Sequence, residues 1–131
     1  MPVTHDHPTA GSMSAAISNA VVRLLSEYTG RGPTKARTYI DEDLITVVLR
    51  DTLTKGERSL LRDGEVALVL ANRKAFQNSM AADMIAAVEQ LSGRSTTAFL
   101  SANHIDPDIA VESFVLTPRI ADEVGIDEEA R

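Results

Sequence analysis

The chain has no cysteine and no tryptophan, and it has only two tyrosines and three phenylalanines among 131 residues. The lack of cysteine excludes disulfides, thiolate metal sites and cysteine nucleophiles, and it agrees with a reducing compartment. The few aromatic side chains leave little surface for stacking nucleic-acid bases. Otherwise the composition is that of an ordinary soluble domain, with 44% hydrophobic and 24% charged residues.

Long apolar runs are also absent. No run approaches the roughly 18 to 20 consecutive apolar residues that a bilayer span requires. The longest helical segment is interrupted by Asn72, Arg73, Lys74, Gln77 and Asp83. The first residues lack the basic and apolar regions of a secretory signal. We therefore expect a cytoplasmic protein with no membrane span, and association with the membrane periphery stays open.

The formal net charge is −6 at pH 7. Proteins that bind nucleic-acid backbones do so mainly by neutralising phosphates with Lys and Arg. An acidic chain is therefore not expected to have a nucleic-acid partner. Local basic patches are compatible with this total, and one of them falls in residues 31–37.

Hydrophobic periodicity divides the sequence into one domain and two tails. Residues 1–13 predict a flexible tail, residues 14–117 a single domain and residues 118–131 an acidic tail. Within the domain, a capping box at Thr54 to Glu57 predicts a short helix that ends at Gly64. The other predicted elements are helices over 14–29 and 65–91, and strands over 34–40, 44–50, 96–102 and 109–116.

Two short segments occur twice in the chain. Residues 28–31, Tyr-Thr-Gly-Arg, are similar to residues 91–94, Leu-Ser-Gly-Arg, and the Ile-Asp-Glu-Asp-Leu of 40–44 is similar to the Ile-Asp-Pro-Asp-Ile of 105–109. The pattern predicts a helix-strand-strand unit used twice. The predicted fold class is α+β, a two-layer sandwich in which a four-stranded, mainly antiparallel sheet carries a long helix on one face. The alternative is chance similarity between short turns.

The segment after the first helix is the main candidate for binding. The turn Gly30-Arg31-Gly32-Pro33 can present backbone amides to an anion, and nearby basic side chains add positive charge. It is not a P-loop, because it follows a helix and no Gly-Lys-Ser/Thr comes after it. The alternative is a helix C-cap and a turn that leads into a strand.

Arg73 is a further candidate, on the apolar stripe of the long helix. It can anchor an anion or an interface, or its methylene groups can simply cover apolar surface. The predicted anion- or partner-binding residues are therefore Arg31, Gly32, Lys35, Arg37 and Arg73.

Two groups of side chains offer donors for a metal ion. The histidines of the N-terminal tail have no further ligands nearby. The aspartates of the two Ile-Asp-X-Asp turns can share a cation only if the turns meet in space, and such aspartates usually satisfy backbone amides. We therefore predict no metal and no cofactor. The side chains considered as donors are His5, His7, Asp41, Asp43, Asp106 and Asp108.

Catalytic chemistry has little support in the sequence. His104 next to the second aspartate turn resembles a general base with its orienting carboxylate, but Ser101 is the only nucleophile nearby. No Gly-X-Ser-X-Gly elbow is present. We predict no catalytic residue, and the enzyme question stays open.

A set of motifs, taken in their order and spacing, resembles the MpsC family over about residues 14–117. The resemblance implies a small bacterial protein associated with a membrane-potential-generating system, which has been linked to sodium translocation and to inorganic-carbon uptake. The motifs are Tyr28 to Arg37, Leu53 to Lys55 with Glu57, Arg73 with Phe76, Val88-Glu89, Gly93-Arg94, Phe99 to Ser101 and Asp106 to Asp108.

The resemblance favours a non-catalytic accessory or regulatory protein, with a membrane transporter complex as the partner. The alternative is a sensor or enzyme that binds a small anion or nucleotide at the Gly30 to Pro33 turn and the adjacent basic strand. The helix over 65–91 would be about 40 Å long, which exceeds what a small sheet requires. This surplus predicts a homodimer through that helix.

Overall fold

A computed structural model of the protein describes residues 10–31 and 35–119. Several sequence-predicted features fall outside these residues: His5 and His7, Gly32 in the basic turn, and most of the predicted acidic tail. The elements are α1 (Ala10–Thr29), β1 (Lys35–Asp41), β2 (Leu44–Arg50), α2 (Lys55–Arg62), α3 (Val66–Ser92), β3 (Thr96–His104) and β4 (Ile109–Leu116).

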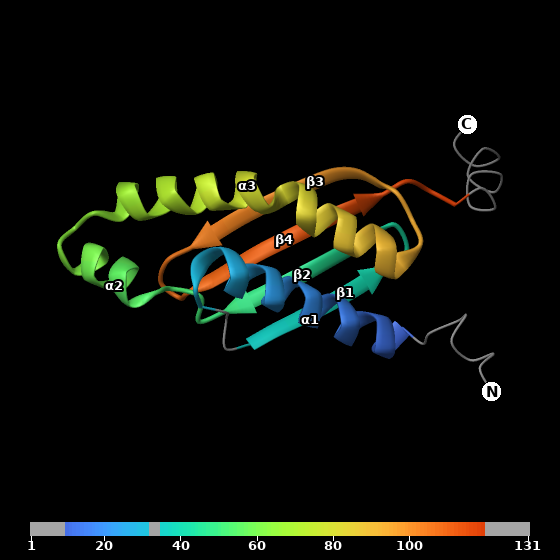
Figure 1. Cartoon of the computed structure of the whole chain (residues 1–131), viewed down its shortest axis with the longest axis horizontal. Helices are drawn as coiled ribbons and strands as arrows, with labels where there is room; N and C mark the ends of the chain where they lie inside the picture. The colour runs from blue at the N-terminus through green and yellow to red at the C-terminus, as the bar shows by residue number, and fades with distance from the viewer. Residues whose placement is uncertain (1–9, 32–34, 120–131) are drawn as a thin grey trace.

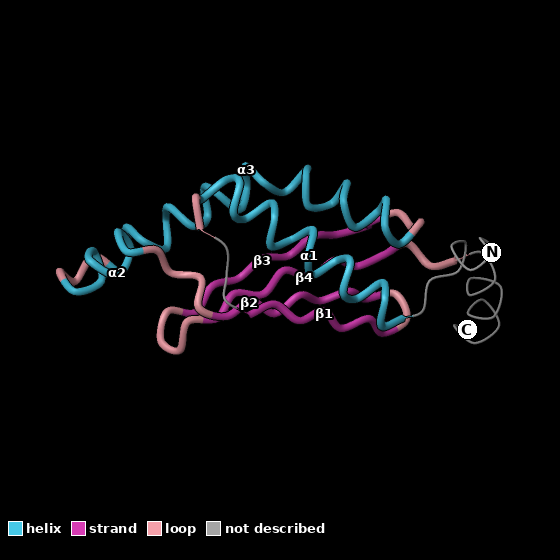
Figure 2. The backbone as a smooth tube through the Cα atoms, turned by 60° about the horizontal axis from the view of Figure 1, so that its bottom comes forward, coloured by secondary structure: helices cyan, strands magenta, loops and turns pink. Residues whose placement is uncertain are grey.

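The four strands form one sheet in the order β1-β2-β4-β3, and every neighbouring pair is antiparallel. Helices α1 and α3 lie side by side on one face of this sheet (Figure 1), and α1 contacts β1 while α3 contacts β3. The tube view in Figure 2 shows the helices above the sheet and no described element below it. The predicted α+β architecture with a long helix packed on an antiparallel sheet is confirmed.

The core lies between the helices and the sheet, and strand alternation decides which side chains enter it. In β4, Ala110, Glu112, Phe114 and Leu116 face the helices and are buried. The rings of Phe99 and Phe114 are 5.0 Å apart between centroids. The helices complete the core with Ile17 and Val21 from α1 and Met80, Met84 and Val88 from α3.

The two predicted repeats have equivalent roles. Gly30 and Gly93 follow their helices with φ values of 80° and 73°, a left-handed conformation that favours glycine. The arginine after each glycine donates to backbone carbonyls: Arg31 to those of Asp51 and Leu53, and Arg94 to those of Glu42 and Thr117. The shared Gly-Arg pair therefore ends a helix and fixes a neighbouring loop.

The two aspartate turns lie at opposite ends of the sheet. Leu44, after the first turn, pairs with Val115, whereas Ile109, after the second turn, pairs with Arg50. The aspartates of the two turns therefore do not meet. Instead, Asp108 accepts hydrogen bonds from the Thr52 hydroxyl and the Leu53 amide, both at 2.9 Å, and ties the two hairpins together.

Two elements are longer than the sequence predicts. Helix α1 begins at Ala10, four residues before the predicted start at Ser14, because Met13 packs against the core. Strand β3 continues through Asn103 and His104, which were predicted to lie in a turn. Asn103 pairs with Ala110 of β4 and bonds to α3, so tertiary contacts hold it in the strand.

The α2–α3 end of the molecule projects past the sheet (Figure 1), and α2 packs on the first turns of α3. Side chains of α3 in this region are exposed: Val66, Leu68 and Leu70. Within the described residues, no helix has the length and apolar character needed to cross a membrane.

Candidate functional site

A cavity of about 330 Å³ lies between the end of α1, the α2–α3 pair and the sheet. Its apolar walls come from Leu25, Leu49, Phe76 and Met80, and Ala110 lies in its floor. In this row of the sheet, Ala110 pairs with Leu49 on one side and Asn103 on the other. The small side chain of Ala110 leaves space between sheet and helices, and this space becomes the cavity.

Glu112 is a buried carboxyl group in the cavity lining, with only 1% of its surface exposed. The Ser101 hydroxyl on the adjacent strand bonds its Oε1, and Gln77 of α3 donates to its Oε2 at 3.4 Å. Burial raises the pKa of Glu112 to about 7, although the hydrogen bonds from Ser101 and Gln77 and the positive charge of Arg73 lower it. Glu112 therefore changes its charge near neutral pH.

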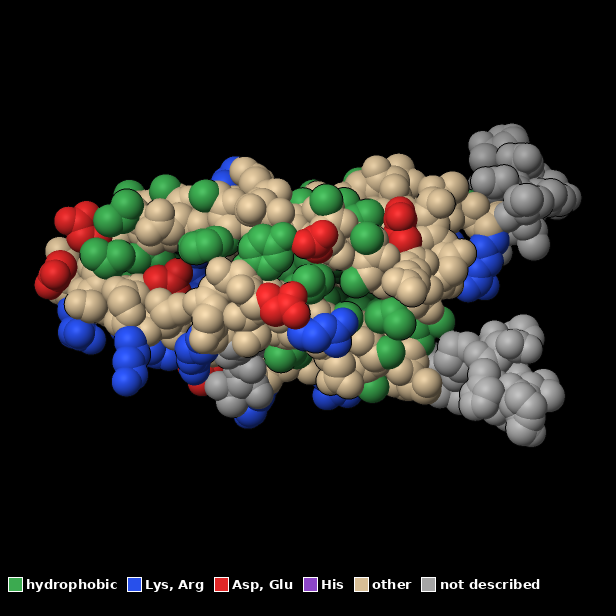
Figure 3. Space-filling model, in the orientation of Figure 1, with side chains coloured by type: hydrophobic (Ala, Val, Ile, Leu, Met, Phe, Trp, Pro, Cys, Tyr) green, Lys and Arg blue, Asp and Glu red, His purple; other side chains and the backbone are tan. Residues whose placement is uncertain are grey.

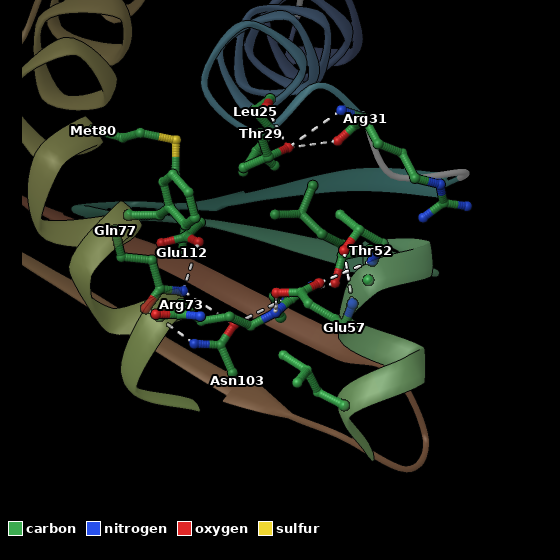
Figure 4. A pocket seen from close by; sticks show the side chains of 17 residues that line it. Leu25, Thr29, Arg31, Thr52, Glu57, Arg73, Gln77, Met80, Asn103 and Glu112 are labelled. Atoms are coloured by element: carbon green, nitrogen blue, oxygen red, sulfur yellow. Dashed lines mark hydrogen bonds and ion pairs between the residues drawn. The ribbon is translucent and has the colours of Figure 1, made fainter. Parts of the chain in front are cut away.

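Gln77 and Asn103 hold each other in a fixed orientation next to Glu112. The Gln77 amide donates to the Asn103 oxygen at 3.1 Å, and the Asn103 amide donates back to the Gln77 oxygen at 3.0 Å. Figure 4 shows the two amides and the Glu112 carboxyl on the same side of the cavity. This reciprocal pair joins α3 to β3 and fixes the polar end of the site.

Arg73 is engaged within the protein. Its Nε and Nη2 donate to the two carboxylate oxygens of Glu57 at 3.0 and 2.8 Å, and its Nη1 donates to the Thr52 hydroxyl at 2.7 Å. Although burial raises the pKa of Glu57, the hydrogen bonds from Arg73 and the Thr54 amide outweigh it, and the pKa is lowered overall. Arg73 thus ties α3 to α2 and to the loop before it.

Arg31 also lines the cavity, but its guanidinium points away from Glu112 (Figure 4). The Nη1 atom donates to the carbonyl oxygens of Asp51 and Leu53 at 2.7 and 2.9 Å, and Nη2 lies 3.3 Å from the Asp51 carboxylate. The side chain fixes the loop after β2. Its backbone turn continues into Gly32, outside the described residues.

Lys35 and Arg37 lie elsewhere, on the face of the sheet that the described helices leave open. Alternation along β1 places them with Tyr39 on this face, whereas Thr38 is buried against α1 and bonds the Ser18 hydroxyl. The guanidinium carbon of Arg37 is 5.5 Å from the centre of the Tyr39 ring, a cation–π contact. The predicted basic residues are thus divided: Arg31 and Arg73 line the cavity, and Lys35 and Arg37 lie on the opposite face.

His104 and Ser101 are on opposite faces of β3, because they are three positions apart and side chains alternate along a strand. Ser101 faces the helices and bonds Glu112, whereas the exposed His104 has its Nδ1 2.8 Å from the Pro107 carbonyl oxygen. The two side chains therefore do not form a base and nucleophile pair. Among the described residues, no group of three or more His, Asp or Glu side chains could hold a metal ion.

A model of a known protein family matches nearly all of the described part of the chain. The model of MpsC, described as a Na⁺-translocating membrane potential-generating system, matches residues 9–118. The chain belongs to the MpsC family. The MpsC match runs from α1 to the end of β4 and includes both the cavity and the open sheet face. No curated protein and no solved structure matches the chain.

Sequence reasoning did not identify Glu112, Gln77 or Asn103 in this MpsC chain. One signal for Glu112 was present: in the strand over 109–116 it shares its phase with Ala110, Phe114 and Leu116, the buried face. A lone carboxylate in the apolar phase of a strand indicates a buried ionisable group. Gln77 and Asn103 had no such signal, because only the packing of α3 on β3 joins them.

Proposed function

We propose that this protein is a non-catalytic accessory component of a membrane-potential-generating system, acting in the cytoplasm at the membrane periphery. In this proposal, it docks through the open face of its sheet onto a subunit whose surface combines acidic and apolar side chains. The description of the MpsC family names such a system, and the chemistry of the open face supports docking.

The composition of the open face carries this proposal. Across the strands, one row reads Lys35, Arg50, Ile109 and His104. The next row consists of Arg37, Val48, Val111 and Ala102. The row after it consists of Tyr39, Thr46, Ser113 and Leu100, and Leu100 is 58% exposed. An apolar sheet surface next to a basic corner is typical of an interface, in which complementary charge guides the partner and apolar area adds affinity.

Arg31 and Arg73 are left out of this docking surface. Both guanidinium groups donate to acceptors within the protein, and moving them to an external anion would break those bonds. The sensor or enzyme for a small anion or nucleotide therefore stays a prediction for the turn at residues 30–33. No contact among the described residues favours it.

Charge reversal at the basic corner tests the docking. The tagged protein, returned to its native cells, should co-purify with a membrane subunit, and the triple reversal should reduce recovery at least tenfold. The control reverses three exposed basic residues on the helices and should leave recovery unchanged. The test variant is K35E/R37E/R50E, and the control is R23E/R62E/K74E.

Two outcomes would contradict the proposal. Native membranes could yield no partner for the unaltered protein, or both triple variants could bind equally well. Circular dichroism of each variant should match that of the unaltered protein, because all six side chains are exposed.

We also propose that the protein is a homodimer through α3, as its length predicts. The exposed apolar side chains of the projecting region support this arrangement, and Leu68 is 44% exposed. Figure 3 shows hydrophobic side chains gathered over this end of the helix-bearing face. Pairing two copies here would bury apolar surface that one chain leaves in water.

A further inference from the structure

We propose that the cavity between the helices and the sheet binds a small molecule with an apolar body and one cationic amine, whose ammonium group meets the Glu112 carboxylate. This inference goes beyond the docking function. The cavity lies on the helix-bearing side of the sheet, away from the basic corner, so either proposal can fail without the other.

The size and walls of the cavity define the body of the ligand. A volume of about 330 Å³ is near the lower end of the range of small-molecule sites. The wall residues Leu25, Leu49, Phe76 and Met80 present hydrocarbon, aromatic and thioether surface. A compact apolar group gains free energy by leaving water for such walls. A strongly polar body, such as a sugar or a nucleotide, would leave its hydrogen-bonding groups unpaired there.

The charges around the cavity define the other end of the ligand. Two guanidinium groups line it: Arg73 pairs with Glu57 at 2.8 Å, and Arg31 lies 3.3 Å from Asp51, a carboxylate that also pairs with Arg58 at 2.8 Å. No ion pair to Glu112 occurs among the residues that the structure describes. When ionised, Glu112 therefore has no direct ion-pair partner among the described residues, although the charge of Arg73 acts on it at longer range, and a cation in the cavity would supply such a partner.

Glu112 also has unused capacity to accept hydrogen bonds. A carboxylate can accept about four, and this one has the Ser101 hydroxyl on Oε1 and a long contact of 3.4 Å from Gln77 on Oε2. The Asn103 oxygen, in contrast, already accepts from Gln77 and from Arg73. An ammonium group supplies up to three donors. Glu112 Oε2 is thus the acceptor that an amine inside the cavity would find.

Three probes with the same apolar body test whether the charge of the polar end decides binding. These are 2-phenylethylamine, 2-phenylethanol and phenylacetate, which share a body and differ in a cationic, neutral or anionic end. Calorimetric titration of the full chain at pH 8 should show binding of the amine at least tenfold tighter than of the alcohol. Phenylacetate should not bind detectably.

Substitutions in the cavity lining test whether the probes bind in this cavity. Glu112→Gln keeps the shape of the side chain, and it should weaken amine binding at least tenfold while leaving the alcohol unchanged. Glu65→Gln, an exposed acid-to-amide change outside the cavity, should leave both unchanged. Ala110→Leu should block the amine and the alcohol by filling the floor of the cavity, and Ala110→Val is a smaller filling that serves if the leucine variant does not fold.

The affinity for the amine should depend on pH. The other ionisable groups that line the cavity are Arg31 before β1, Glu57 of α2 and Arg73 of α3. Arginines stay charged, and the pKa of Glu57 is lowered, so these groups do not titrate near pH 7. Because the pKa of Glu112 is about 7, amine binding should be about tenfold weaker at pH 6 than at pH 8. Glu112→Gln should remove this difference.

The proposal is overturned if phenylacetate binds as well as the amine, or if Glu112→Gln leaves amine affinity and its pH dependence intact. It is equally overturned if none of the three probes binds at 10 mM or below. Retained binding in the folded Ala110→Leu or Ala110→Val variant would place the probes in another site and also reject the proposal.

Discussion

At the scale of single residues, Glu112 and Glu57 show how surroundings decide the properties of a carboxylate. Glu57 faces Arg73, and this contact keeps it ionised. Glu112 lies among apolar side chains, and burial raises its pKa. Both residues line one cavity, yet one completes an ion pair and the other has a charge that depends on pH.

Replacement of Glu112 by Gln should change how stability depends on pH. The folded protein keeps the Glu112 proton up to about pH 7, whereas the unfolded chain releases it near the ordinary value of 4.5. The folded state therefore binds more protons in this window, and the Glu112 contribution to stability falls as the pH rises from about 4.5 to about 7. Gln does not ionise and avoids this loss.

Urea unfolding of both proteins at pH 5, 6, 7 and 8 measures the effect. The free energy of unfolding of Glu112→Gln should rise relative to the unaltered protein across this series, by up to about 3 kcal/mol. Glu65→Gln is the control and should show no such trend. A constant offset between Glu112→Gln and the unaltered protein would show that Glu112 does not titrate in this window.

At the scale of elements, the junction between α2 and α3 depends on one carboxylate with two roles. Glu57 completes the predicted capping box, in which its side chain accepts from the Thr54 amide at 2.9 Å and the Thr54 hydroxyl accepts from the Glu57 amide at 3.1 Å. The same carboxylate binds Arg73 of α3. The sequence predicted the cap because the motif spans four consecutive residues, but it contained no indication of the ion pair across sixteen residues.

Two substitutions separate these roles. Thr54→Ala removes the hydroxyl that accepts from the Glu57 amide, leaves the Arg73 contact in place and should lower the free energy of unfolding by about 1 kcal/mol. Glu57→Ala keeps the bond from the residue 57 amide to the Thr54 hydroxyl, but it removes the acceptor of the Thr54 amide and leaves the Arg73 guanidinium without its carboxylate, so it should cost more, about 2 to 3 kcal/mol. Urea unfolding at pH 7 compares them. Equal losses would mean that the Arg73 contact adds nothing to stability.

At the scale of the whole molecule, the sheet has one face covered by helices and one open face, and the α2–α3 end projects past it. The helix-bearing face contains the cavity, the open sheet face carries the basic corner, and the α2–α3 end exposes apolar side chains. The open sheet face lies on the side of the sheet opposite the cavity, so the proposed docking and the proposed ligand use different surfaces.

The dimer proposal predicts a mass twice that of one chain by light scattering coupled to gel filtration. Leu68→Lys places a charge in the exposed apolar region of α3 and should shift the mass to that of one chain. Leu100→Lys changes an exposed leucine on the open sheet face and should keep the dimer. A monomeric mass for the unaltered protein at 100 μM would reject the proposal.

The sequence by itself determined the elements, the α+β class and the family. Local sequence patterns are enough to locate these elements, because each pattern involves residues that are close together in the chain. The patterns are the hydrophobic period, the glycines that end helices, the capping box and the aspartate turns. Only the tertiary structure brought the residues of the candidate site together. The strand order β1-β2-β4-β3 and the packing of α3 bring Glu57, Arg73, Asn103 and Glu112 around one cavity, and place Lys35 and Arg37 on the other face. Burial and pairing between distant residues, which no local pattern encodes, determine the charge of Glu112 and the partner of Arg73.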